Sequence, residues 1–261
     1  VLVGGQSGTS TQEFTSDGTF NLSGITGITS VTFELHGGRG SMGNYGSIPG
    51  GAGGKVNVSL KANQIANFAS ATWTCEIGSG FAYGSFSKAG GSKTASGDGG
   101  TGGNGHPGGS GTAHGGGGGA VTGVLRNGTA VLGAGGGGGG GSNGYDGGAG
   151  QGGQPVPSSI GGIQATNALL GFGVGGAGGN YGCIGGGGGG GGGGCGTSNQ
   201  LIGGGGGTGG IGGGPGGSGG HGGGAGGSQG VSSYSTTYFE SGTLADSDRN
   251  TGKATMVVNY N

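Results

Sequence analysis

Residues 97–111 read GDGGTGGNGHPGGSG, and residues 213–230 read GGPGGSGGHGGGAGGSQG. Both stretches lie in the block 89–230, which holds 72 of the chain's 92 glycines, because 18 precede the block and 2 follow it. Non-glycine residues often fall at every third position, and in the first stretch these are Asp98, Thr101, Asn104, Pro107 and Ser110. A period of three residues is that of the polyproline II helix, which rises about 3.1 Å per residue. We therefore predict that the block packs as a bundle of polyglycine II helices.

Two other glycine-rich classes compete with this interpretation. Collagen repeats Gly-X-Y and needs proline at roughly 15–20% of positions or more, whereas this block repeats Gly-Gly-X and the whole chain has 5 prolines. A flexible Gly/Ser linker is disordered and has no reason to keep a period. A linker is also not expected to contain hydrophobic hairpin sequence, which this block does.

A bundle of glycine helices cannot be stable by itself and must be held by other parts of the chain. Ordering each backbone costs roughly 1–2 kcal/mol, and glycine has no side chain to bury in return. An isolated polyproline II helix forms no internal hydrogen bonds, so neighbouring helices must bond to one another and something else must hold their ends. Residues 1–88 and 231–261 are the candidates for that role.

These two flanks carry most of the alternating apolar and polar sequence that is typical of β-strands. We predict an all-β fold in a single domain, 1–261, in which 1–88 and 231–261 form a jelly-roll-like β-sandwich and 89–230 is a long insertion. The expected strands lie at 31–35, 55–60, 72–77, 234–239 and 253–260. Inside the insertion, 120–132 predicts a hairpin, because Asn127-Gly128 between two β-type runs favours a type I′ turn.

Several of these segments together resemble a known glycine-rich β domain. They are His36-Gly37-Gly38-Arg39-Gly40, the stretch GGAGGKV at 50–56, the glycine-flanked hairpin and the closing stretch GKATMVV at 252–258. The domain occurs in the extracellular region of the anaplastic lymphoma kinase and leukocyte tyrosine kinase receptors, and in phage tail fibres and related bacterial and protist surface proteins. The resemblance implies a β-sandwich with polyglycine helices packed at one end, exposed binding loops and no catalysis. The chain has no kinase or membrane-spanning sequence and few cysteines, so cytokine binding is not implied.

Composition restricts the partners and the location. With 8 basic and 9 acidic residues the net charge is −1, which argues against nucleic acid as a partner. No apolar run reaches the length of a membrane span, so no membrane insertion is expected. The start at Val1-Leu2-Val3 is typical of a mature secreted chain or a trimmed one, and it predicts a strand that pairs in its own or a neighbour's sheet. Asn21, Asn57 and Asn127 are N-glycosylation acceptors, provided that the chain follows a eukaryotic secretory route.

The cysteines and histidines do not predict a metal site. Cys75, Cys183 and Cys195 make an odd number, so at least one thiol is not in an internal disulfide. Ten glycines separate Cys183 and Ile184 from Cys195, and a straight run would place the two sulfur-bearing residues roughly 37 Å apart at about 3.1 Å per residue, too far for a disulfide. No metal-binding spacing involves the histidines, which we interpret as packing or surface residues: His36, His106, His114 and His221.

The segment Asp246-Ser247-Asp248-Arg249-Asn250 resembles the start of a calcium loop. That loop needs glycine at its sixth position and a carboxylate at its twelfth, where this chain has Thr251 and Val257. Asp246, Asp248 and Asn250 are therefore interpreted as part of a turn between strands. No phosphate-binding loop and no catalytic pattern of Ser, His and Asp or of paired carboxylates stands out, so we predict no enzyme activity, no metal and no cofactor.

The resulting hypothesis is a non-enzymatic structural or adhesive protein, secreted or on a virion surface. Its rigid, nearly uncharged scaffold would present loops at 142–146, 154–170 and 196–202 to copies of itself, to a fibre or surface protein, or to carbohydrate or a cell-surface receptor. The polar loop residues that are candidates for contact are Asn143, Tyr145, Asp146, Gln154, Gln164, Asn167, Asn199 and Gln200.

The alternative function is ice binding by a polyglycine II bundle, as in springtail antifreeze proteins, whose Gly-Gly-X helices form a flat face of small residues. Here the third positions include Asp98, Asn104, Pro107 and His221. That mixture makes a poor flat face, and thermal hysteresis of the purified chain separates the two functions.

Overall fold

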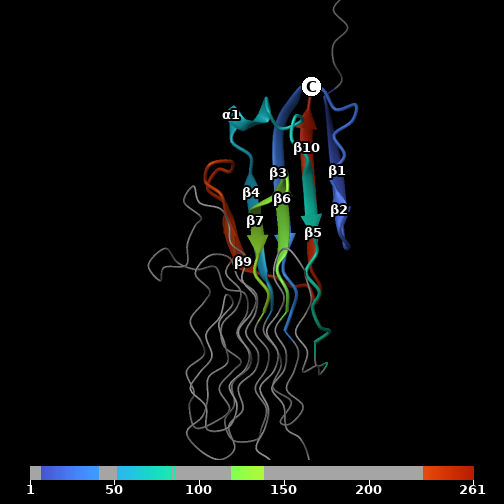
Figure 1. Ribbon diagram of the computed structural model, residues 1–261, viewed down its shortest axis with the longest axis vertical. Helices are drawn as coiled ribbons and strands as arrows, with labels where there is room; N and C mark the ends of the chain where they lie inside the picture. The colour runs from blue at the N-terminus through green and yellow to red at the C-terminus, as the bar shows by residue number, and fades with distance from the viewer. Residues whose placement is uncertain (1–6, 41–51, 84, 86–118, 138–231) are drawn as a thin grey trace, which may run out of the picture.

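The computed structural model describes residues 7–40, 52–83, 85, 119–137 and 232–261. These residues form ten strands, one short helix and the loops between them. The strands pair into two five-stranded sheets, and every strand pairing is antiparallel. Figure 1 shows the strands of both sheets running along the long axis of the molecule. The prediction of an all-β fold is confirmed.

The first sheet has the strand order β1-β10-β3-β4-β9. Its strands come from the two ends of the chain, since β1 near the N-terminus pairs along its whole length with β10 near the C-terminus. In this order they are β1 (Gly8–Phe14), β10 (Lys253–Tyr260), β3 (Ile28–His36), β4 (Gly54–Ser59) and β9 (Thr243–Asp246).

The second sheet has the order β2-β5-β6-β7-β8. Its strands are β2 (Gly18–Thr19), β5 (Trp73–Glu76), β6 (Thr122–Arg126), β7 (Thr129–Ala134) and β8 (Ser233–Tyr234), and α1 (Ala62–Ile65) connects β4 of the first sheet to β5. The hairpin β6–β7 is central to this sheet. The sheets are therefore not built from the chain ends alone, because a hairpin inside the predicted insertion completes one of them.

The hairpin turn has the backbone that its sequence favours. Asn127 has a φ of 51° and Gly128 a φ of 78°, and a type I′ turn requires positive φ at both central residues. The Asn127 side-chain oxygen also accepts a hydrogen bond from the Thr72 N–H at 2.8 Å. This bond ties the hairpin to the chain just before β5, its neighbour in the sheet.

One predicted strand is wrong, and three strands, β1, the two-residue β2 and β9, were not predicted. The segment 234–239 does not continue as a strand, because the chain turns at 235–239 and Phe239 N–H donates to Ser235 O at 3.0 Å. The turn lets Tyr234 and Phe239 both reach the core while the chain passes from the second sheet to β9 of the first. The sequence does not predict strands β1 and β9, because neither has alternating apolar and polar residues. In β1 the half-buried positions include Ser10 and Gln12.

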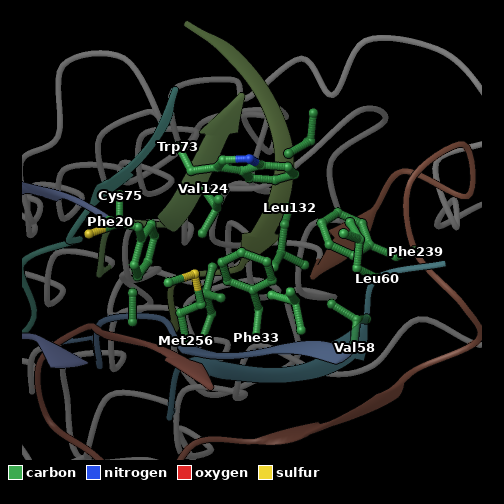
Figure 2. Close-up of a cluster of buried hydrophobic side chains, with 14 of the residues drawn as sticks. Phe20, Phe33, Val58, Leu60, Trp73, Cys75, Val124, Leu132, Phe239 and Met256 are labelled. Atoms are coloured by element: carbon green, nitrogen blue, oxygen red, sulfur yellow. The ribbon is translucent and has the colours of Figure 1, made fainter. Parts of the chain in front are cut away.

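The inner faces of the two sheets contribute to one hydrophobic cluster. Phe33 of the first sheet stacks on Trp73 of the second, with ring centroids 5.6 Å apart. The Trp73 indole N–H donates to Phe68 O at 3.0 Å, which satisfies the polar atom of an otherwise buried ring. Figure 2 shows Trp73, Val124 and Leu132 on one side of the cluster and Phe33, Val58 and Met256 on the other.

Candidate functional site

Six short segments meet at one end of the two sheets, and we call them the glycine junction. Each one continues or precedes a strand: β3, β5 and β7 run out into the junction, while β4, β6 and β10 start from it. The segments are 37–40, 52–54, 78–81, 119–121, 135–137 and 250–252, and each contains glycine.

The segment 37–40 bonds to all five of the others. Gly37 N–H donates to Gly54 O at 2.8 Å, and Gly38 N–H donates to Ala120 O at 2.9 Å. The remaining bonds are Arg39 N–H to Asn250 O at 2.8 Å, Gly137 N–H to Gly38 O at 2.8 Å and Phe81 N–H to Arg39 O at 3.0 Å. A strand in a sheet has at most two hydrogen-bonded neighbours. Bonding in several directions is instead what a helix with three residues per turn permits, because successive backbone groups point about 120° apart.

The outer segments also bond to one another around 37–40. The bonds are Gly54 N–H to Gly135 O at 2.7 Å, Gly119 N–H to Gly137 O at 2.8 Å, Ala120 N–H to Ser79 O at 2.9 Å and Gly252 N–H to Gly78 O at 3.0 Å. The loop 247–249 between β9 and β10 completes this ring, since Ser247 N–H donates to Gly53 O at 2.6 Å. The junction is thus one backbone bundle with a central segment.

The junction leaves no room for side chains at eight of its glycines. A Cβ built on Gly37 would overlap the Gly135 carbonyl oxygen, and one on Gly38 would overlap that of Ser79. A Cβ on Gly119 would overlap the Gly38 carbonyl oxygen. All of these obstacles are backbone atoms, which cannot swing away as a flexible side chain can. Stacked sheets lie about 10 Å apart where side chains separate them, so the missing Cβ atoms let the two sheets converge until their backbones bond directly.

A polar network lies beside the junction, on the outer face of the first sheet. His36 at the end of β3 is buried, and its Nδ1 lies 2.8 Å from Ser247 Oγ. Its Nε2 lies 3.1 Å from Glu34 Oε1, and Lys55 Nζ on β4 lies 2.9 Å from the other Glu34 oxygen. An ionised carboxylate only accepts hydrogen bonds, so Nε2 carries the proton and Nδ1 accepts from the Ser247 hydroxyl. Ser247 Oγ in turn accepts from Arg249 N–H at 3.1 Å.

Burial and neighbouring charges shift the pKa of both His36 and Glu34. Burial lowers the pKa of His36 below its ordinary value, although the hydrogen bond and charge of Glu34 oppose the shift. Burial alone would raise the pKa of Glu34. The hydrogen bonds and charges of Lys55 and His36 together outweigh burial, so the pKa of Glu34 is lowered.

Ser247, His36 and Glu34 have the residue types of a catalytic triad, but they are not grouped in the sequence. Glu34 and His36 alternate on β3, but Ser247 is 211 residues away from His36 in the chain, so no local pattern connects them. Ser247 is only 3% exposed, and its hydroxyl is held between the His36 ring and Arg249 N–H. A nucleophile must reach a substrate, so this arrangement is suited to joining β3 to the β9–β10 loop.

The structure places the other predicted residues as follows. Asn21 and Asn127 are exposed, and Asn57 is half-buried on β4. Asp246 ends β9, Asp248 is exposed, and Asn250 contributes its backbone oxygen to the junction. Within the described ranges, no three His, Cys, Asp or Glu side chains gather closely enough to hold a metal ion.

Cys75 is buried in β5. The predicted loop residues from Asn143 to Gln200, Cys183 and Cys195, Val1-Leu2-Val3, and His106, His114 and His221 all lie outside the described residues.

A shallow groove of about 310 Å³ lies at the other end of the sheets, between 19–23 and 69–72. Its lining combines hydroxyl groups with apolar carbon, and the acceptor Asn21 is part of the same loop. No described polar side chain is both buried and directed into it, so the groove has no marked chemical preference.

The described residues contain no helix with the length and apolarity to cross a bilayer. No known family model matches the chain, and no curated protein matches it significantly.

Proposed function

We propose that the two sheets form a jelly-roll-like β-sandwich that anchors a bundle of polyglycine II helices formed by 89–230. The observation that carries this proposal is the bonding of 37–40 to five neighbouring segments. Such multidirectional bonding extends naturally into a bundle and not into a sheet. The hydrophobic core between the sheets supplies the stability that glycine cannot, and the junction transfers the fixed spacing of the strands to the chains that leave them.

In this proposal the protein is a non-enzymatic structural or adhesive component, secreted or on a virion surface. The scaffold has a net charge of only −1, so long-range electrostatic attraction contributes little to its attachment. The segments 142–146, 154–170 and 196–202 would carry the side chains that make contact. Their partners would be copies of this chain, a fibre or surface protein, or a carbohydrate-bearing receptor.

The test replaces 154–170 with a short Gly/Ser turn in the full chain. The melting temperature should stay close to that of the parent chain, and self-association should be lost in sedimentation velocity and electron microscopy. Adhesion to an immobilised polysaccharide should be lost as well, and the parent's binding should change little between low and high salt. Thr129→Ala, an exposed change on the hairpin, is the control that should leave association unchanged.

Two outcomes would contradict the proposal. If the replacement unfolds the domain, the segment belongs to a core and does not present a loop. If the variant folds and still associates or binds as the parent does, the contact surface lies elsewhere, for example on the exposed strands at the chain ends.

A further inference from the structure

The loop 247–249 holds the junction through two kinds of contact. Its backbone contributes the Ser247 N–H to Gly53 O bond, and just beyond it the Asn250 oxygen accepts from Arg39 N–H. Its side-chain contact is the Ser247 hydroxyl on His36 Nδ1. His36 directly precedes the central segment 37–40, so its ring connects that segment to the loop which completes the ring of neighbours.

The hydrogen bonds of this contact require a neutral imidazole. A second proton would turn Nδ1 from an acceptor into a donor. Ser247 Oγ could accept from it beside the Arg249 N–H, but the buried hydroxyl would then have to turn its own hydrogen away from Nδ1, its only acceptor among the described contacts. The protonated ring would leave one of these polar groups without a partner, which is costly in a buried site.

Asp248 is a second possible partner for His36 Nδ1, but it lies too far away for a hydrogen bond. Asp248 Oδ1 is 3.7 Å from Nδ1, and the Asp248 side chain is 90% exposed. A carboxylate is a better acceptor for an imidazolium than a hydroxyl is. Asp248 can accept from Nδ1, however, only if the loop shifts and the hydrogen bond between Ser247 and Nδ1 breaks. The charged groups that act on the ring are Glu34 on β3 and Asp248 in the loop, which favour the proton, and Lys55 on β4, which opposes it together with burial. On the other neighbouring strand, β10, Lys253 is opposite His36 in the register, and its Nζ lies 2.6 Å from Glu13 Oε2.

We propose that His36 is an acid-sensitive latch: protonation of its ring exchanges Ser247 for Asp248 as the Nδ1 partner and loosens the loop 247–249 from the glycine junction. The device goes beyond the scaffold role and does not depend on what the loops of the glycine block bind. Its consequence is that acidification opens the molecule locally, where strands pass into glycine segments, while the hydrophobic core stays closed.

Amide hydrogen exchange of the full chain between pH 7.5 and 5.5 tests the latch, because Glu34 stays ionised throughout that range. After correction for intrinsic exchange, the opening constants of Ser247 N–H and Arg39 N–H should rise on acidification, by at most tenfold per pH unit for one proton. The Leu60 N–H, which donates to Val31 O at the end of the β3–β4 pairing, should rise by a smaller factor, set only by the fall in global stability on acidification.

Two variants separate the latch from general acid sensitivity. His36→Gln can still donate to Glu34 but does not titrate, so the pH dependence at Ser247 should disappear. Asp248→Asn changes an exposed residue and should fold normally, and its Ser247 N–H should respond more weakly to acid because the charged alternative partner is gone.

The latch is overturned if the Ser247 response persists in His36→Gln, if it is unchanged in Asp248→Asn, or if Leu60 opens in step with Ser247. Should His36→Gln fail to fold, the Asp248→Asn comparison and the NMR titration of the His36 ring decide alone. A ring that stays neutral down to pH 5.5 while Ser247 opens would also refute the proposal.

Discussion

Replacing Gly37 by alanine adds a single methyl group to a crowded part of the glycine junction. The new Cβ would overlap the Gly135 carbonyl oxygen and would lie 2.7 Å from the carbonyl carbon of Gly135 and 2.8 Å from Ala134 O. Real Cβ atoms are not found this close to backbone atoms, so 37–40 or 135–137 must move. Either movement stretches hydrogen bonds that the central segment makes with its neighbours.

The expected loss follows from these contacts. Overpacking a well-packed site costs about 1–3 kcal/mol, and each backbone hydrogen bond contributes about 1 kcal/mol net. Losing two or three of the five bonds to 37–40 therefore brings the total to about 3–6 kcal/mol. That is a large share of a typical domain stability of about 5–15 kcal/mol.

Urea unfolding followed by tryptophan fluorescence measures this loss, because Trp73 is the only tryptophan and is 1% exposed in the core. Gly24→Ala is the matched control. Gly24 has a φ of +80° with nothing within 4 Å of its Cβ position, so the control carries only the left-handed backbone strain of about 1–2 kcal/mol. If Gly37→Ala is no more destabilising than Gly24→Ala, backbone-to-backbone packing does not hold the junction.

Three further outcomes are expected. Peptide mass mapping should find no Cys183–Cys195 disulfide, and such a bridge would show that the decaglycine run folds back. Asn127→Ala should lower the free energy of unfolding by about 2 kcal/mol, from positive-φ strain and the lost bond to Thr72, whereas Asn127→Gly should lose only the bond. Lys55→Met should cost at most about 1 kcal/mol near neutral pH, since both partners of its ion pair with Glu34 are about one-third exposed.

The network of His36, Glu34 and Lys55 determines how the free energy of unfolding changes with pH. The pKa of His36 is lowered in the folded state, so its contribution to stability is complete above the ordinary histidine value and declines as pH falls below it. The pKa of Glu34 is also lowered, so a second contribution persists above the ordinary glutamate value and is lost as pH falls through the folded value. The free energy of unfolding should therefore fall in two steps on acidification. Lys55→Met should shrink the second step, because the folded pKa of Glu34 then rises toward its unfolded value, and a second step of unchanged size would contradict the assignment to Glu34.

Much of the fold is readable from local patterns. The alternation at 31–35, 55–60 and 253–260 predicts β3, β4 and β10, because one face of each strand is buried and the other is not. Asn127-Gly128 predicts the β6–β7 hairpin, because few other residue pairs accept positive φ at both positions. Local pattern fails at β1, whose half-buried positions include the polar Ser10 and Gln12, and at 235–239, where the buried Phe239 follows a turn.

The sequence by itself predicted that the glycine runs of 89–230, which have almost no side chains to bury, pack through their backbone, and that the hairpin at 120–132 is an exception. It also predicted most of the long strands that supply the core. Only the tertiary structure decided which glycine segments are neighbours and that Ser247 meets His36. The physical reason is that glycine has no side chain to encode a partner. The neighbours of 37–40 are therefore fixed by the strands that run into the junction, and those strands are ordered by pairings and core contacts between residues far apart in the chain.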